Sequence, residues 1–273
     1  MGAAGLSLYL AAPGSKFWAS GVSVSLPTAI ERAAAFGYDA IEIMPRSFDD
    51  PEPGGLRTLA ARHGLAVAGL ASGFLAIEQG LTFTHPDPGV RREAVEVFGR
   101  CLEMARQAGA ALVSIGVVRG KLQSGLAHDQ AMEHLLACVR DVGRAAQECG
   151  VTLVVEPGNR YETDFLHTVE DANAFLSAVN LPSVRLMIDT FHMNIEETSI
   201  PGAISRAGPR LAHVHLADSN RRAPGWGHLD FDAVVRALRA IDYRGGIGLE
   251  MVFEPDFDAA ARQGIEFVRR LFQ

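Results

Sequence analysis

The sequence lacks the features of disulfide-rich, membrane-spanning and nucleic-acid-binding proteins. It has three cysteines, an odd number without a CxxC spacing, so we expect free thiols and a cytoplasmic location. The N-terminal MGAAGLSLYLAA has no basic stretch and only a short apolar run, so we expect neither a leader peptide nor a membrane span. The formal net charge is −7 and no basic cluster exceeds Arg221-Arg222, which argues against nucleic acid or an anionic membrane as a partner.

Two glycine-rich nucleotide-binding motifs are also missing. No GxGxxG follows the first apolar run and no GxxxxGK[ST] occurs anywhere, which removes the usual signals of a doubly wound open sheet. No linker-like stretch divides the 273 residues, and 48% of them are hydrophobic. We therefore expect a single domain, 1–273, with a large core and without an organic cofactor.

What the sequence does contain is an alternation of apolar runs with amphipathic helical patterns, several of which end at a glycine. Eight such units in this length predict an α/β fold, a closed (β/α)8 or TIM barrel with its active site at the C-terminal ends of the strands. The expected strands are Gly5–Leu10, Ala40–Met44, Ala66–Leu70, Ala111–Gly116, Val151–Glu156, Val184–Asp189, Leu211–Leu216 and Ile247–Glu250. The expected helices include Pro27–Phe36, Gly54–His63, Pro88–Ala108, Asp129–Cys149, Thr168–Val179 and Phe231–Ile241.

Metal-ligand side chains stand at the ends of four expected strands. The run Val151–Glu156 leads into Pro157, which cannot continue the strand's hydrogen bonds, so Glu156 should project from the rim. Three later strands are similar: two end in Asp189 and Glu250, and the one between them carries His215 next to its last residue. A closed ring would bring the four together, and three buried carboxylates repel one another unless a cation lies among them. Oxygen ligands with one imidazole suit Mn²⁺, Co²⁺ or Mg²⁺, and we also keep Zn²⁺.

The same segments resemble the xylose isomerase-like TIM barrel superfamily of sugar isomerases and epimerases, and are most similar to its tagatose or psicose 3-epimerase branch. The resemblance rests on EPGNRYET with FLHT, DTFHMNIEE, HVHLADSNRRAPGWGHLDF and the final GLE, which together span Glu156 to Glu250. It implies that the metal ligands are Glu156, Asp189, His215 and Glu250, and that the substrate contacts are Glu162, His192 and Arg221. It also implies a small sugar as substrate and a homo-oligomer, either a dimer or a tetramer.

The function that the resemblance implies is a divalent-metal-dependent ketose 3-epimerase. Such an enzyme removes the proton beside a ketose carbonyl, passes through a cis-enediolate and returns a proton to the opposite face. Our hypothesis is that Glu156 and Glu250 are the two catalytic acid/bases as well as metal ligands. His192 and Arg221 would hold the substrate near O2, and Glu162 would orient His192 or a sugar hydroxyl.

Other functions of the same scaffold stay open. An inosose- or dehydroshikimate-type dehydratase would use the same metal to eliminate water, and a hydroxypyruvate-type aldose–ketose isomerase would move the carbonyl. An endonuclease IV-like enzyme should carry DxH after the seventh strand, where this chain has Asp218, Ser219 and Asn220. A barrel that has lost catalysis is disfavoured by the intact Glu156 and Glu250.

Residues around the expected site raise further hypotheses. Glu42 lies inside an apolar strand and needs a partner, so we expect it behind the ligands or at the substrate. His213 is two residues from His215, and we expect it one layer deeper in the barrel. Arg119 and Lys121 follow the fourth strand and are the local candidates for gripping a phosphate or carboxylate.

The pocket wall should differ from that of the resembling family. His167 and Gly158 stand where that family usually has Asn and a bulky apolar residue, and the wall decides between sugars. Trp18 and Trp226 fall in loops after the first and seventh strands, where they could also line a sugar pocket.

Overall fold

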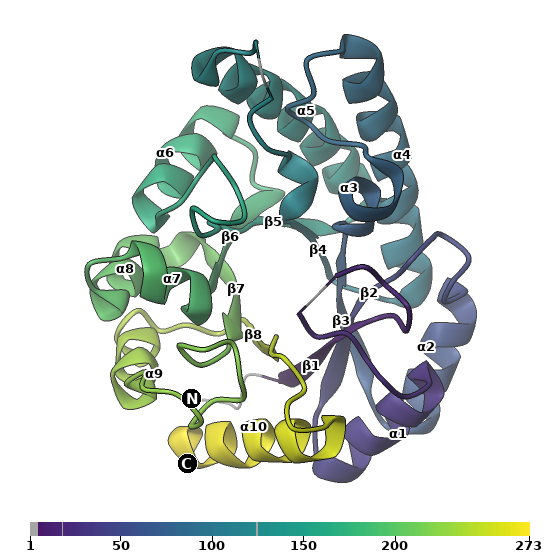
Figure 1. Ribbon diagram of the computed structural model, residues 1–273, viewed down its shortest axis with the longest axis vertical. Helices are drawn as coiled ribbons and strands as arrows, with labels where there is room; N and C mark the ends of the chain where they lie inside the picture. The colour runs from purple at the N-terminus through teal and green to yellow at the C-terminus, as the bar shows by residue number, and fades with distance from the viewer. Residues whose placement is uncertain (1–4, 18, 124) are drawn as a thin grey trace.

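Eight parallel strands form one closed barrel in the computed structural model, which describes residues 5–17, 19–123 and 125–273 (Figure 1). Each strand pairs with the one before it, and the ring closes where Leu6 of β1 pairs with Ile247 of β8. The strands are β1 (Leu6–Ala11), β2 (Ala40–Met44), β3 (Ala66–Ala71), β4 (Leu112–Ile115), β5 (Thr152–Val155), β6 (Val184–Asp189), β7 (Leu211–Leu216) and β8 (Gly246–Leu249). The predicted TIM barrel of the α/β class is confirmed.

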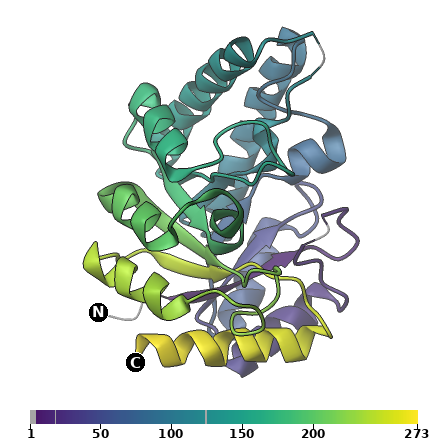
Figure 2. The same ribbon diagram turned by 60° about the vertical axis from the view of Figure 1, so that its left-hand side comes forward.

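Helices surround the ring of strands, and Figure 2 shows α9 and α10 side by side outside it. They are α1 (Leu26–Phe36), α2 (Pro53–Arg62), α3 (Phe74–Gln79), α4 (Pro88–Ala108), α5 (His128–Cys149), α6 (Val169–Val179), α7 (Thr190–Glu196), α8 (Ile200–Ala207), α9 (Phe231–Ala240) and α10 (Phe257–Phe272), with short 3₁₀ turns η1 (Val117–Arg119) and η2 (Gly208–Arg210). Gly37, Gly109 and Gly150 adopt the left-handed conformation just past α1, α4 and α5, which ends these helices as predicted. Within the described residues, no helix is both long and apolar enough to cross a bilayer.

Most strand boundaries agree with the prediction, and the small differences concern the site. Glu156 and Glu250 lie one residue beyond β5 and β8 rather than at the last position of each strand. The N–H of Glu156 still donates to the carbonyl of Ile115 at 3.4 Å, so the chain keeps its direction along the sheet up to Pro157. The side chain of Glu156 therefore leaves the backbone at the rim.

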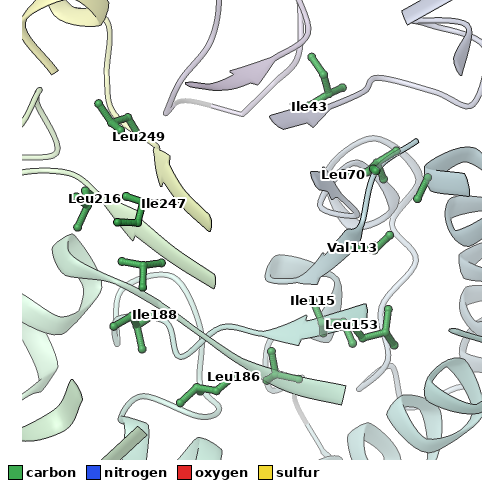
Figure 3. Packing of buried hydrophobic residues seen from close by; sticks show 14 of the residues in the cluster. Ile43, Leu70, Val113, Ile115, Leu153, Leu186, Ile188, Leu216, Ile247 and Leu249 are labelled. Carbon is green, nitrogen blue, oxygen red and sulfur yellow. The ribbon is translucent and has the colours of Figure 1, made fainter. Parts of the chain in front are cut away.

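Side chains alternate along each strand between the helix layer and the barrel interior. Ile188, Leu216 and Leu249 are at most 1% exposed and pack in the apolar layer that surrounds the strands (Figure 3). The side chains of the residues next to them in sequence, Asp189, His215 and Glu250, point the opposite way, into the barrel. The apolar layer thus holds these strands in place, and the same strands carry the polar side chains that point into the C-terminal end of the barrel.

Candidate metal centre

Four side chains from consecutive strand ends meet at the C-terminal mouth of the barrel. Glu156 follows β5, Asp189 ends β6, His215 lies near the end of β7 and Glu250 follows β8. One ligand atom from each of the four lies within 4.8 Å of the others. Asp189, His215 and Glu250 are at most 4% exposed, so water contributes little to their solvation. The structure brings together all four residues that the sequence predicts as ligands.

Glu42 of β2 supports His215 from within the barrel. Its Oε2 lies 2.9 Å from His215 Nε2, its Oε1 lies 3.0 Å from His213 Nε2, and Ser7 Oγ also donates to Oε1. Burial raises the pKa of Glu42, but the two imidazoles outweigh it and hold that pKa well below its usual value. A carboxylate on Nε2 keeps a proton there and turns Nδ1 toward the four-residue cluster, where it lies 3.1 Å from Glu250 Oε2. His213 lies deeper than His215, as predicted, and is 1% exposed.

The electrostatics of the four-residue cluster suit a cation. Burial and the neighbouring carboxylates of Glu250 and Asp189 raise the pKa of Glu156 to about 8. Burial is also the main cause that raises the pKa of Asp189 to about 7. Arg221 lowers this pKa, and Glu250 raises it. Within the described part of the chain, Glu156 Oε1 is buried without a hydrogen-bond partner. Three carboxylates, one of them with a free oxygen, and one imidazole form a donor set that fits a hard divalent ion.

Arg221 lies between two of the carboxylates. Its guanidinium is 3.1 Å from Asp189 Oδ2 and 2.9 Å from Glu250 Oε2, and it is 2% exposed. Burial raises the pKa of Glu250, but Arg221 and then His215 lower it far more, so this carboxylate stays ionised. Arg221 has φ 63°, a left-handed conformation that costs energy in a residue other than glycine. The N–H of Val252 donates to its carbonyl at 2.8 Å, which helps to hold the loop in place.

Asn159 links Glu162 to His192 and was missed in the sequence analysis. Its Nδ2 donates to Glu162 Oε1 at 3.0 Å and lies 2.8 Å from His192 Nδ1, and its own N–H donates to the same Nδ1 at 3.4 Å. Because Nδ1 accepts these bonds, Nε2 carries the proton, and it lies 4.0 Å from Glu156 Oε1. Burial and Arg221 lower the pKa of His192, which keeps the ring neutral. The only sequence signal for Asn159 is its place between two predicted residues in EPGNRYE.

One pocket at the mouth contains all three predicted substrate contacts. Glu162, His192 and Arg221 line it together with Glu156, His215 and Glu250, and its aromatic wall comes from Tyr9 and Phe17. The expected sugar-binding role of the tryptophans finds no support, because Trp226 packs half-buried against the core outside this pocket and Trp18 lies outside the described residues.

The two candidates for gripping an anion, Arg119 and Lys121, and the two residues expected to alter the pocket wall, Gly158 and His167, lie at different depths. Arg119 and Gly158 line the pocket, and Arg119 is 3% exposed. Lys121 is exposed, and its Nζ donates to the carbonyl of Tyr161 at 3.3 Å. His167 lies behind the wall, where its Nδ1 is 3.0 Å from the carbonyl oxygen of Gly158.

We expect Glu42→Gln to weaken metal binding without unfolding the barrel. The amide keeps the shape but removes the negative charge that holds His215 in place, and losing such a supporting group usually costs about 10–100-fold in metal affinity. Titration of the ion-free protein with Mn²⁺ measures the change. An unchanged dissociation constant in a folded variant would show that Glu42 has no such role.

We expect Gly248→Ala to destabilise the barrel at the same point. A Cβ there would lie 2.8 Å from His215 Cδ2 and closer still to Glu42 Oε1, so both side chains must shift. Overpacking of this kind lowers the free energy of unfolding by about 1–3 kcal/mol. Gly99→Ala in α4 is the matched control, because its Cβ would meet none of the described residues within 4 Å, so this change should leave stability unchanged or slightly higher. Urea denaturation of the two variants compares them, and equal stabilities would contradict the tight packing described.

Comparison with known proteins places the chain in a family. A family model described as xylose isomerase-like TIM barrel matches residues 30–271. D-psicose 3-epimerase of Ruminiclostridium cellulolyticum is 31% identical over 232 residues, which cover 81% of this chain and 76% of the relative. The ketose 3-epimerase of Arthrobacter globiformis is 30% identical over 226 residues, covering 81% and 75%.

Solved structures agree with these sequence matches. A structure of L-ribulose 3-epimerase matches with a TM-score of 0.86 at 26% identity and covers 98% of this chain and 94% of that one. A D-allulose 3-epimerase from Methylomonas sp. matches with a TM-score of 0.83 at 27% identity, covering 98% of each chain. By its sequence, its barrel and these matches, the chain belongs to the xylose isomerase-like TIM barrel family.

Proposed function

We propose that this chain is a divalent-metal-dependent ketose 3-epimerase. The observation that carries the proposal is the pair of carboxylates Glu156 and Glu250 in one cluster with Asp189 and His215. Relatives at 30–31% identity over most of the chain are named as D-psicose or ketose 3-epimerases, which supports the same reaction. The proposed ion is Mn²⁺, Co²⁺ or Mg²⁺.

Inversion at C3 requires a proton carrier on each face of the carbon. Glu156 and Glu250 directly follow β5 and β8, which have β6 and β7 between them in the ring, so they reach the pocket from different directions. In the ion-free protein their pKa values are displaced in opposite directions, because burial raises that of Glu156, whereas at Glu250 burial is outweighed by Arg221 and His215 together, which lower it. Glu250 is assigned the removal of the C3 proton and Glu156 the return of a proton to the opposite face, and the roles exchange in the reverse direction. A divalent ion, when bound, would polarise the ketose carbonyl and stabilise the negative charge that develops there.

His192 and Arg221 would position the substrate oxygens. The Nε2 proton of His192 and the guanidinium of Arg221 line the same pocket, and both side chains are at most 5% exposed. Fixed donors at a buried site stabilise a developing oxyanion better than mobile water does. Glu162 would act on His192 through Asn159, which binds both side chains.

The wider setting of the enzyme is part of the proposal. We propose that residues 1–273 form one barrel domain that works without an organic cofactor, as a cytoplasmic homo-oligomer with two or four subunits.

Incubation in D₂O with Mn²⁺ or Co²⁺ and a panel of free ketoses tests the function, with deuterium at each carbon followed by NMR. Exchange at C3 with inversion is the expected result. Exchange at C1 alone would indicate an aldose–ketose isomerase, and loss of water to an enol or diketone would indicate a dehydratase. Either outcome would overturn the epimerase proposal.

A further inference from the structure

The guanidinium of Arg119 is buried in the wall of the pocket and forms no ion pair with any residue that the structure describes. Arg119 ends η1 after β4, is 3% exposed and lines the pocket beside Glu156 and Gly158. Its Nη1 donates to the backbone carbonyl of Glu156, a neutral acceptor. Among the residues that the structure describes, no carboxylate forms an ion pair with Arg119, and its buried Nε has no hydrogen-bond partner. A buried cation that forms no ion pair lowers the stability of the folded protein.

The surrounding chain is built to hold this guanidinium at the pocket. A Cβ at Gly158 would lie 2.5 Å from Arg119 Nη2 and 3.6 Å from its Cζ, so only glycine leaves the guanidinium its space. The hydroxyl of Thr84 donates to the carbonyl of Arg119 at 2.8 Å, and the N–H of Arg119 donates to the carbonyl of Gly116 at 3.1 Å. These two bonds fix the backbone of Arg119, and the carbonyl of Glu156 holds Nη1 of its guanidinium.

Nearby negative charges do not satisfy Arg119. Glu156 and Glu162 act on it from a distance, and each is engaged elsewhere, Glu156 in the four-residue cluster and Glu162 with Asn159. Burial lowers the pKa of Arg119 to about 10, which still leaves it charged at neutral pH. Lys121 differs, because it is exposed and bonded to the carbonyl of Tyr161.

We propose that Arg119 is a specificity-determining residue that binds an anionic group of the substrate, so that the preferred ketose carries a terminal carboxylate or phosphate. This inference rests on the proposed function and deepens it by naming the substrate class. A guanidinium presents two parallel donors that match either anion. Three of the four cluster residues come from β6, β7 and β8, whereas Arg119 follows β4, so the anion would bind on the β4 side of the pocket, carried by the end of the sugar that the cluster does not hold.

The test compares three forms of each ketohexose: the neutral sugar, the same sugar oxidised to a carboxylate at C6, and the same sugar phosphorylated at C6. The wild-type protein loaded with Mn²⁺, Arg119→Met, Arg119→Lys and the matched control Lys121→Met are measured with all three. One readout is the ratio of kcat/KM for C3 inversion, anionic over neutral. A second readout, independent of turnover, is the rise in melting temperature that each sugar causes.

The wild type and Lys121→Met should prefer one of the anionic forms by about 10–100-fold, the range expected for charge-assisted hydrogen bonds. Arg119→Met should bring the ratio close to one, and Arg119→Lys should fall between. The anionic sugar that gives the larger kcat/KM ratio shows whether the site prefers a carboxylate or a phosphate. A wild-type ratio near one, or a ratio that Arg119→Met leaves intact, would overturn the inference while the epimerase proposal stands. If no sugar is inverted but the anion-dependent melting shift disappears in Arg119→Met, the anion site stands and the epimerase proposal fails. If Arg119→Met does not fold, the ratio for Arg119→Lys decides.

Discussion

Glu156→Gln and Glu250→Gln are each expected to lower the rate of C3 inversion by roughly 10²–10⁴-fold, the usual contribution of a positioned acid or base. Glutamine keeps the shape of the side chain and one oxygen ligand, but its amide cannot carry the proton. The rates are measured with saturating Mn²⁺, so that weaker metal binding does not mimic lost proton transfer. Glu148→Gln, a change of the same kind at an exposed position of α5, is the control and should have wild-type activity.

The same two variants should differ in deuterium exchange. Each retains the proton carrier on one face, so each should exchange the C3 hydrogen of only one of the two epimers with D₂O, and without inversion. The two variants should therefore show opposite preferences. Inversion by both variants at rates close to the wild type would contradict the roles given to Glu156 and Glu250.

Metal binding is expected to stabilise the protein strongly, and more so at higher pH. An ion present at about 1,000 times its dissociation constant adds about 4 kcal/mol to the free energy of unfolding, which corresponds to a melting-temperature rise of roughly 8–16 °C in a chain of this size. Because the donors must be deprotonated to bind the ion, the rise depends on their pKa values. Thermal melts with and without Mn²⁺ at pH 6, 7 and 8 measure it.

The sign of the pH dependence follows from the raised pKa values. The pKa of Glu156 is about 8 and that of Asp189 about 7, against 4.5 and 3.8 for the ordinary side chains. These groups hold protons in the ion-free folded protein that the unfolded chain releases, so their contribution to stability is lost as the pH rises from about 4 to about 8. The ion displaces these protons, and its stabilising effect therefore grows through the same window and levels off above about pH 8. Glu156→Gln should show a flatter dependence, and an effect of Mn²⁺ that falls between pH 6 and pH 8 would contradict this account.

The barrel and its four strand-end groups could be predicted because both follow from local patterns. Apolar runs, glycine helix ends and Pro157 identify the strand ends, and a closed ring makes the groups at these ends converge. The resemblance then pointed to Glu162, His192 and Arg221, and the structure places all three in the same pocket.

The partners of these residues could not be predicted, because they depend on contacts between distant segments. Glu42 contacts His215, which is 173 residues away in the sequence. Whether Glu42 lies behind the metal ligands or at the substrate depends on the width of the barrel. Asn159 looked like an ordinary loop residue until His192 was placed 33 residues away. Arg119 and Lys121 looked equivalent in sequence, and only the burial of one and the exposure of the other separates them.

A crystal structure of the protein soaked with Mn²⁺, with the anomalous signal of the metal, tests most directly whether the four strand ends form one metal centre. Two clusters share His215, the four-residue cluster and a deeper group of Glu42, His213 and His215. The oxygens of Glu42 already accept bonds from Ser7 and both imidazoles, whereas Glu156 Oε1 lacks a partner among the described residues. We predict a single peak bound by Glu156, Asp189, His215 and Glu250. A peak at the deeper group, or none at either, would contradict the account.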